Sequence, residues 1–210
     1  MSRDSILLVG GGLLQEQAVH TAHALGLYVI LTDGNPECHC RSLVDKFYHV
    51  DIYDAGTHAG LALAIKTTHN ELNLRGVFTQ GHDCEYTVAC AAQAAVLPGI
   101  TPEAALNCKN KARMRRCFDE AGIWNPKWKE LTGTEHIPDL SEFSLPCVIK
   151  PLDNCASRGT TIITESWQVK DAIRKACAAS STGTCLVEER LTGPEQSVEI
   201  IFDGRKRISC

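Results

Sequence analysis

The stretch "SLPCVIKPLDNCASRGTTIITE", Ser144 to Glu165, joins an apolar strand to a second strand through a small polar loop. Lys150 ends the first strand, where a buried ammonium group costs free energy unless an anion meets it. The loop that follows has small side chains, hydroxyl groups and Gly159, so its backbone N–H groups can come close to an anion. We therefore expect this stretch to hold phosphate.

Strand-like and helix-like segments alternate through the first hundred residues. "SILLVG" and "LYVILTD" are continuous apolar runs, typical of parallel strands that are buried on both faces. Between them, "LLQEQAVHTAHALG" has apolar residues at helical spacing. "FYHVD" and "GVFTQG" are further strands, and a helical segment follows each of them. This alternation predicts an α/β fold with a doubly wound parallel sheet over residues 1–100.

The second half of the chain has a different order. Residues 101–126 are predicted to form a helical bridge, which begins with a Thr-Pro pair suited to a helix N-terminus. The strands "KWKEL", "LPCVIKP" and "TTIIT", a helix over "SWQVKDAIRKACAAS" and the strand "TCLVEERL" follow, and they predict a small α+β unit over 127–187. The last strands, "SVEIIFDG" and "KRISC", predict a hairpin that turns at Asp203-Gly204.

Composition excludes several classes of protein. The chain has 210 residues, 44% of them hydrophobic, and a net charge of -4, so nucleic acid and anionic membranes are not expected partners. No apolar run approaches the roughly 20 residues of a membrane span, and the N-terminus lacks a signal-peptide layout, so we expect a cytoplasmic protein. The eleven cysteines are odd in number and lie mostly in apolar segments, which favours reduced thiols. "ECHCR" lacks a second pair of zinc ligands, and we expect no metal site there.

A glycine-rich turn follows the first strand. Gly10, Gly11 and Gly12 precede the first helix, whose N-terminus favours an anion, and Asp33 closes the second strand as the acid of a dinucleotide site would. Gln15, however, replaces the third glycine of that fingerprint, and the glycines suit a tight turn equally well. A ligand here would lie at the carboxyl edge of the sheet. The candidate substrate residues are Gly11, Gly12, Asp33, Gln80, His82 and Asp83.

The phosphate hypothesis depends on a combination of residues. Lys111, Lys150 and the loop between the two strands together suit a triphosphate, whereas either lysine alone is usually a surface residue. The loop lacks the G-x-x-x-x-G-K-[ST] pattern of a P-loop. In "LVEERLTGPEQSVEI", Glu188 could accept a hydrogen bond from an adenine amine and Glu195 could accept from ribose hydroxyls. Taken alone, "EER" also suits a solvated strand end.

The series "NKARMRRCFDEAGIWNP", "LPCVIKPLDNCASRGTT" and "LVEERLTGPEQSVEI" resembles the ATP-grasp superfamily, which includes D-alanine:D-alanine ligase, biotin carboxylase and carbamoyl phosphate synthase. The resemblance covers essentially the whole chain. It implies a Rossmann-like pre-ATP-grasp domain over 1–100, the small ATP-grasp lid subdomain over 127–187, and the start of the large subdomain over 188–210.

The resemblance also implies which residues contact ATP. Lys111 and Lys150 match the two phosphate lysines. Glu188 matches the residue that meets the adenine amine, and Glu195 matches the acid that binds ribose. The other implied contacts are the phosphate-covering loop Ser157, Arg158, Gly159, Thr160 and Thr161, and the base-holding hinge Glu189 and Leu191.

The family chemistry is activation of a carboxylate by ATP to an acylphosphate, which an amine or another nucleophile then attacks. Magnesium ions neutralise the phosphate charge. The resemblance places the magnesium ligands beyond residue 210, so we assign no catalytic residue and no metal ligand here. We expect this chain alone to bind ATP weakly without turning it over. The expected partners are ATP and a small carboxylate, and dimers are common in the family.

Two other classes of protein compete with the ligase hypothesis. One is a nucleotide-sensing protein that performs no chemistry. The other is an NAD-dependent oxidoreductase built on the "VGGG" turn, which leaves Lys150, the loop after it and the "EER" segment unexplained.

Overall fold

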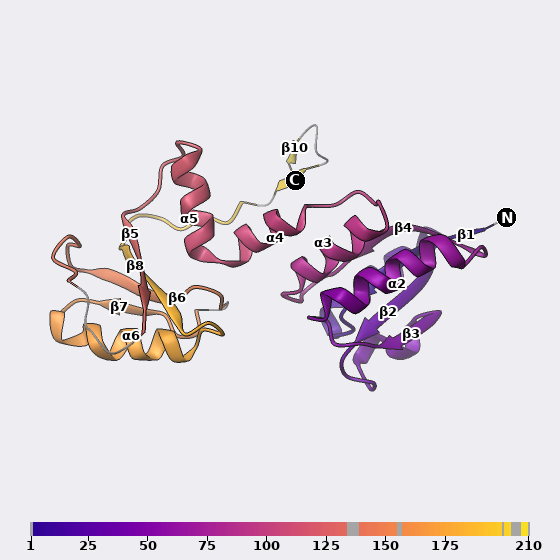
Figure 1. Cartoon of the computed structure of the whole chain (residues 1–210), viewed down its shortest axis with the longest axis horizontal. Coiled ribbons are helices and arrows are strands. Elements are labelled where there is room, and N and C mark those ends of the chain that lie inside the picture. The colour runs from indigo at the N-terminus through magenta and orange to yellow at the C-terminus, as the bar shows by residue number, and fades with distance from the viewer. Residues whose placement is uncertain (1, 134–138, 155–156, 199, 203–206, 210) are drawn as a thin grey trace. The chain divides into compact units, whose positions relative to one another are not determined.

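The computed structural model of the chain describes residues 2–133, 139–154, 157–198, 200–202 and 207–209. It divides into two compact units, Met1–Met114 and Arg115–Cys210 (Figure 1). Each unit has its own sheet and its own buried core.

The first unit is built on a parallel sheet. Its strands are β1 (Arg3–Val9), β2 (Tyr28–Asp33), β3 (Lys46–His49) and β4 (Leu72–Phe78), in the order β3-β2-β1-β4. Leu7 of β1 lies opposite Ile30 on one side and Val77 on the other. Because β1 is central and covered on both faces, its side chains must be apolar in succession, which explains the continuous run "ILLV".

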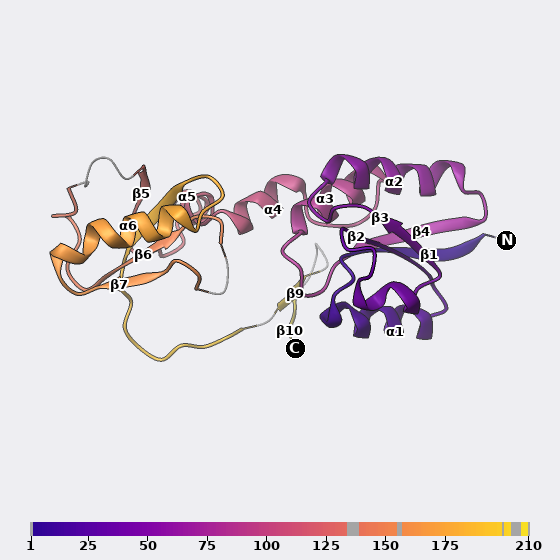
Figure 2. The same cartoon turned by 90° about the horizontal axis from the view of Figure 1, so that it is seen from below.

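Helices cover both faces of this sheet (Figure 2). On one face, Leu8 packs with Val19 and Ala22 of α1 (Glu16–Ala24), which follows the 3-10 turn η1 (Leu13–Gln15). On the other face, Leu7 packs with Ala62 and Ala91, which belong to α2 (Ala55–Thr68) and α3 (Glu85–Ala94). The second 3-10 turn, η2 (His39–Leu43), lies on the α1 side through Cys40.

Two helices follow the parallel sheet. α4 (Pro102–Lys109) begins at the predicted place, where the Thr101 hydroxyl accepts a hydrogen bond from the Ala104 N–H at 3.1 Å. α5 (Lys111–Glu120) ends shortly before Gly122, whose φ of 64° is a left-handed conformation that suits glycine. Both helices lie within residues 101–126, where the sequence predicts helical structure.

The second unit is built on an antiparallel sheet with the order β5-β8-β6-β7. Its strands are β5 (Trp128–Thr132), β6 (Cys147–Pro151), β7 (Thr161–Ile163) and β8 (Thr184–Glu189). The 3-10 turn η3 (Ser166–Gln168) leads into α6 (Val169–Ala178), which packs on one face of the sheet. Ile149, Ile163 and Val187 point to that face and form the core with α6.

Strand alternation leaves the opposite face of this sheet free for a different role. The sequence neighbours of the core residues point away from α6; they are Val148, Lys150 and Glu188.

After this sheet in the sequence, β9 (Ile200–Phe202) and β10 (Arg207–Ser209) pair antiparallel, as the sequence predicts. The predicted turn at Asp203-Gly204 lies outside the described residues.

The predicted mixed α/β class is confirmed by the parallel sheet β3-β2-β1-β4 and the antiparallel sheet β5-β8-β6-β7. Throughout the described ranges, each helix is too short or too polar to span a bilayer.

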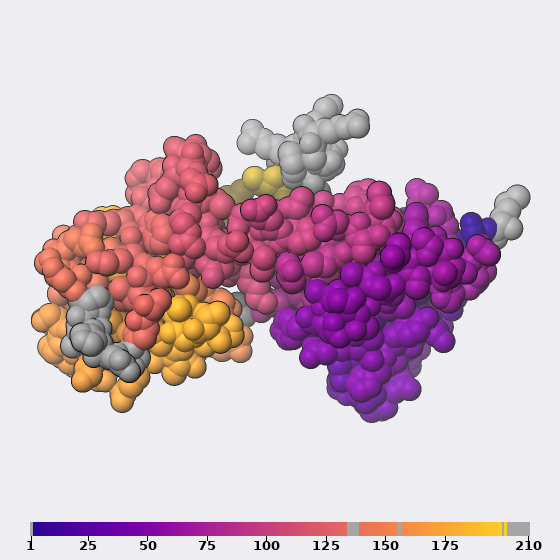
Figure 3. All heavy atoms as spheres, in the orientation of Figure 1, coloured from indigo at the N-terminus to yellow at the C-terminus, as the bar shows by residue number. Residues whose placement is uncertain are grey.

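The core of the first unit depends on Leu7, which is 0% exposed, whereas Leu63 of α2 is 46% exposed. Figure 3 shows atoms of α2 at the surface of this unit. We expect Leu7→Ala to destabilise the unit by about 2–5 kcal/mol because it opens a cavity. We expect Leu63→Ala to change its stability by about 0.5 kcal/mol or less. Hydrogen exchange of the β1 amide groups measures both, and equal effects would contradict the assigned core.

Candidate functional site

A polar pocket of about 630 Å³ lies on the free face of the antiparallel sheet, within the second unit. Strands β6, β7 and β8, the loop between β6 and β7, and the connector after β8 all contribute to it. Its lining residues are Arg115, Val148, Lys150, Ser157, Thr160, Ile162, Glu188, Glu189, Arg190, Leu191, Thr192, Gly193 and Glu195.

A buried carboxylate with two cations forms the centre of this pocket. Glu188 is only 5% exposed. Its Oε1 accepts a hydrogen bond from Arg115 Nε at 2.7 Å, and its Oε2 pairs with Lys150 Nζ. The side chains of Arg115 and Lys150 are 15% and 20% exposed, so all three charges are largely removed from water.

These contacts determine the charge state of Glu188. Burial raises the pKa of this carboxyl group, but the hydrogen bonds from Arg115 and Lys150 lower it more, so its pKa lies below the usual value for glutamate. Glu188 is therefore a carboxylate at neutral pH and acts only as a hydrogen-bond acceptor.

The sheet register brings Lys150 and Glu188 together. Val148 lies directly opposite Glu188, so Lys150, two residues further along β6, is its diagonal neighbour on the same face. Diagonal neighbours lie within reach of a long side chain. The apolar strand with a terminal lysine and the "EER" strand are thus adjacent, and the Lys150 ammonium meets Glu188.

Arg115 was not among the residues predicted for the site. It comes from α5, and its guanidinium also donates from Nη1 to Asn125 Oδ1 at 2.9 Å. The sequence held one signal for it: Arg115 follows Lys111 by four residues in a predicted helix, and such residues share a helix face. Lys111 itself begins α5 and belongs to the first unit, so it is not part of the pocket described here.

The loop between β6 and β7 is tied to the end of α6. The backbone carbonyl of Ser157 accepts a hydrogen bond from the Thr160 N–H at 3.1 Å, which closes a turn around Arg158 and Gly159. Gly159 has a φ of 80°, and a Cβ there would lie 2.6 Å from the Cβ of Ala179. Asn154, before the turn, donates to the Ala179 carbonyl at 2.8 Å. Gly159 is therefore required by close packing as well as by the backbone conformation.

Of the predicted loop residues, Ser157 and Thr160 line the pocket and Thr161 does not. Thr161 starts β7, where alternate side chains point to opposite faces. Its side chain lies on the α6 side, in a separate depression lined by Trp167 and Lys175. Its buried hydroxyl has no hydrogen-bond partner in the described structure.

The last residue of β8 and the connector after it supply the other predicted residues. Glu189, Leu191 and Glu195 all line the pocket. The Glu189 N–H donates to the Lys127 carbonyl at 2.9 Å, which holds the start of the connector against the segment before β5. Leu191 is 53% exposed and presents an apolar surface to the pocket.

In the first unit, the glycine turn meets side chains from distant parts of that unit. The Gly11 N–H donates to Asp33 Oδ2 at 2.6 Å, and the Gly12 N–H contacts His82 Nε2 at 3.3 Å. Added Cβ atoms at Gly10 and Gly11 would lie 2.6 Å from the His82 ring and 2.5 Å from Cys38 Sγ. These contacts favour the tight-turn interpretation, because the chain itself occupies the donors that a ligand would use.

The other two candidates in this unit lie in the loop after β4. The Gln80 N–H donates to Gln15 Oε1 at 2.6 Å, and the Asp83 carbonyl accepts from Lys109 Nζ at 3.3 Å. Gln15 is fully buried, and its Nε2 has no partner among the described residues. Gln15, which breaks the dinucleotide fingerprint, thus holds the loop that carries Gln80 beside the glycine turn.

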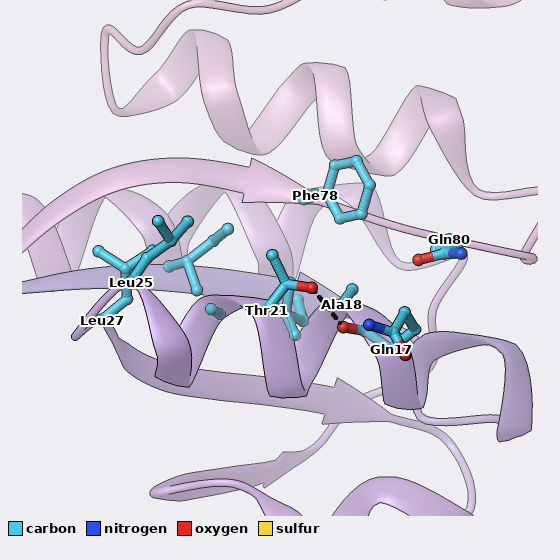
Figure 4. A pocket seen from close by; sticks show the side chains of 10 residues that line it. Gln17, Ala18, Thr21, Leu25, Leu27, Phe78 and Gln80 are labelled. Carbon is cyan, nitrogen blue, oxygen red and sulfur yellow. Dashed lines mark hydrogen bonds between the residues drawn. The ribbon is translucent and has the colours of Figure 1, made fainter.

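A separate pocket lies in the first unit and is mainly apolar. It has a volume of about 300 Å³ and lies between α1 and strands β1 and β4 (Figure 4). Leu25, Leu27 and Phe78 supply apolar surface, and Gln80 lies at its rim (Figure 4). The other predicted substrate residues are not among its lining residues, so it does not extend the polar cluster at the glycine turn.

Cys38 and Cys40 of the "ECHCR" segment are buried free thiols. Burial raises the pKa of the Cys40 thiol to about 11 and also raises that of Cys38, so both remain protonated. Across the described ranges, no three His, Cys, Asp or Glu side chains come together in a way that could hold a metal ion.

The close packing of the β6–β7 loop can be tested with two glycines. We expect Gly159→Ala to destabilise the second unit by more than the roughly 1–2 kcal/mol that a left-handed alanine costs, because its Cβ also collides with Ala179. Gly183→Ala is the matched control, with a φ of 67° and open space around an added Cβ. Urea unfolding followed by tryptophan fluorescence reports on this unit, since Trp124, Trp128 and Trp167 all lie in it. Equal losses would contradict the packing argument.

The buried ion pairs predict a pH dependence of stability. We expect Glu188→Gln to cost about 3 kcal/mol at neutral pH, because Arg115 and Lys150 lose their shared partner. The pKa of Glu188 is lowered in the folded state, so its stabilising effect is complete above the usual value of about 4.3 and is lost as the pH falls through the lowered value. The difference between wild type and variant in urea unfolding should therefore shrink below about pH 4. A constant difference down to about pH 2 would contradict the assignment.

Two known enzymes are similar to this chain in sequence. The chain is 25% identical to the D-alanine–D-alanine ligase of Maridesulfovibrio salexigens over 199 residues, which is 95% of this chain and 61% of that protein. It is 22% identical to a formate-dependent phosphoribosylglycinamide formyltransferase of Burkholderia lata over 191 residues, 89% of this chain and 46% of the relative. No protein-family model matches the chain.

Solved structures share the fold. The ADP complex of PurK, an N5-carboxyaminoimidazole ribonucleotide synthetase, superimposes with a TM-score of 0.70 at 18% identity, covering 95% of this chain and 49% of that one. The chain thus spans roughly half to three-fifths of the length of these three proteins. These relatives and structural neighbours are ATP-grasp ligases, and the chain is similar to an N-terminal portion of them.

Proposed function

We propose that this chain binds ATP in the pocket of its second unit, as the nucleotide-binding part of a ligase that activates a carboxylate. The observation that carries this proposal is the buried Glu188 carboxylate, paired with Arg115 and Lys150 and facing a pocket of about 630 Å³. A fully ionised acceptor beside a movable cation suits a ligand that has both a hydrogen-bond donor and a strongly anionic group.

The pocket has apolar surface and a hydrogen-bond acceptor for the adenine base. Val148, Ile162 and Leu191 provide apolar surface, and Ile162 and Leu191 are 47% and 53% exposed. A planar base would cover this surface, which is favourable because apolar area leaves water. Glu188 lies beside the same surface and can accept from the exocyclic amine of adenine.

The ribose and phosphates have candidate partners in the same pocket. Glu195 is the proposed acceptor for the ribose hydroxyls, and Glu189 and Leu191 are the proposed hinge. Ser157 and Thr160 present the loop to the phosphates, with Arg158 and Gly159 in the turn between them. Lys150 is the proposed phosphate cation, which exchanges its pairing with Glu188 for the more negative triphosphate.

The remaining predicted residues do not line this pocket. We keep Lys111 as the first of the two phosphate lysines and Thr161 as a loop residue, supported only by the family resemblance. The first unit is proposed as the Rossmann-like pre-ATP-grasp domain, with a doubly wound sheet over 1–100. Its carboxyl edge, where Gly11, Gly12, Asp33, Gln80, His82 and Asp83 lie, is the proposed substrate region.

The proposed reaction of the whole ligase is phosphorylation of a small carboxylate by ATP with release of ADP, followed by attack of an amine or another nucleophile on the acylphosphate with loss of inorganic phosphate. Magnesium would neutralise the phosphate charge in such a reaction. No magnesium ligand is assigned among the described residues, where no suitable cluster occurs.

Nucleotide binding can be measured by isothermal titration with the non-hydrolysable analogue AMP-PNP and magnesium. We expect Lys150→Met and Glu195→Gln each to weaken binding by about tenfold or more, which is roughly 1.4 kcal/mol. Lys170→Ala, on the exposed side of α6, is the control for loss of a positive charge and should bind like wild type. Lys150→Met keeps the apolar stem of the lysine, so its effect reports the ammonium group.

Equal binding by wild type, Lys150→Met and Glu195→Gln would contradict the proposed site. Binding of NADH without binding of AMP-PNP would support the oxidoreductase alternative instead.

A further inference from the structure

We propose that Arg115 is the positioning residue for Glu188: it stays bound to Glu188 Oε1 while Lys150 leaves Oε2 for phosphate, and so makes recognition of the adenine amino group depend on α5. This inference rests on the proposed ATP site. It assigns to Arg115 the preference for a 6-amino purine over a 6-oxo purine.

The two cations hold Glu188 in different ways. Lys150 contacts Oε2 from the end of a flexible four-carbon stem. Arg115 contacts Oε1 from Nε at 2.7 Å, while its Nη1 donates to Asn125 Oδ1 at 2.9 Å. The planar guanidinium is thus held at two points, and a change in one contact strains the other. Lys150 is therefore the cation that can leave.

A chain of hydrogen bonds holds Arg115 from behind. Asn125 Nδ2 donates to the Arg115 carbonyl at 2.8 Å and to Asp119 Oδ1 at 2.9 Å. Asp119 Oδ2 accepts from Trp128 Nε1 at 2.9 Å. Trp128 lies directly opposite Glu188 in the pairing of β5 with β8, so the chain returns to the strand that carries the carboxylate. This closed arrangement fixes Arg115 before any ligand arrives.

When Lys150 leaves, Glu188 loses one of its two paired cations. Its Oε2 becomes free to accept an amino group, but burial then disfavours the charged form unless a cation remains. Arg115, only 15% exposed, supplies that cation. An ionised carboxylate attracts the 6-amino group of adenine and repels the 6-oxo group of guanine, whereas a protonated one can donate to the oxo group. Arg115 thereby sets the base preference through Glu188.

The test compares ATP, GTP and inorganic tripolyphosphate, which carries phosphates without a base, by isothermal titration. We expect Arg115→Met to weaken ATP binding by about tenfold or more and to reduce the preference for ATP over GTP by a similar factor. Binding of tripolyphosphate should stay within about twofold of wild type, whereas Lys150→Met should weaken it. ATP binding by Arg115→Met should also weaken more than that of wild type as the pH falls, because Glu188 then binds a proton more readily.

Three further variants guard against a merely structural explanation. Arg115→Lys should restore part of the base preference, because it returns the charge without the second contact to Asn125. Asn125→Ala leaves the Arg115 charge in place but loosens it, and should cause a smaller change in the same direction. Arg116→Met is the matched control, since Arg116 lies on the same helix, is half exposed and pairs with Glu130 rather than with Glu188.

The outcomes separate this inference from the proposed function. If wild type binds neither ATP nor tripolyphosphate, the ATP site is wrong and the role of Arg115 fails with it. If wild type binds both and Lys150→Met weakens both, the ATP site stands. In that case an unchanged ratio of ATP to GTP affinity in Arg115→Met, or an equal loss for all three ligands, would overturn the role of Arg115 alone.

Discussion

A carboxylate buried on a sheet face must keep its cations, and the second unit is organised by that constraint. Glu188 on β8 is paired with Arg115 of α5 and Lys150 of β6, so three separate elements meet at one charge. Removing any partner leaves a buried charge without compensation, which is far costlier than the net worth of the intact cluster. The cluster therefore specifies an arrangement more than it adds stability.

The pleat of the antiparallel sheet separates stability from binding. On β6 and β8, Ile149 and Val187 point toward α6, while Lys150 and Glu188 point to the pocket. A one-residue slip of either strand would bury the charges under α6 and expose the core. The same apolar contacts with α6 that stabilise the unit thus also fix the site residues in register.

The glycines of the two units have a similar role. Gly159 lets the loop approach Ala179, and Gly11 lets the first turn approach Cys38. In both places, the missing side chain makes room for packing within the protein. A ligand at the first turn would have to displace Asp33 and His82 from the backbone N–H groups that they now contact. The β6–β7 loop instead borders an open pocket through Ser157 and Thr160.

The sequence by itself determined the elements and most of the candidate residues. Helical and strand periodicities are local properties of the chain, so the parallel strands, α4 and the α+β order could be predicted without knowledge of packing. Lys150 and Glu188 could be selected because a charged residue at the end of an apolar strand is unusual. The hairpin of β9 and β10 followed from two short strands close together in the sequence.

Only the tertiary structure decided which of these residues meet. Arg115 and Glu188 are 73 positions apart, and Gly12 and His82 are 70 positions apart. Contacts of this kind depend on strand register and on how helices dock, neither of which a local pattern encodes. Thr161, next to two pocket residues in the sequence, points to the opposite face of β7. The sequence therefore predicted a place for phosphate, and folding determined that Lys150 pairs there with Glu188.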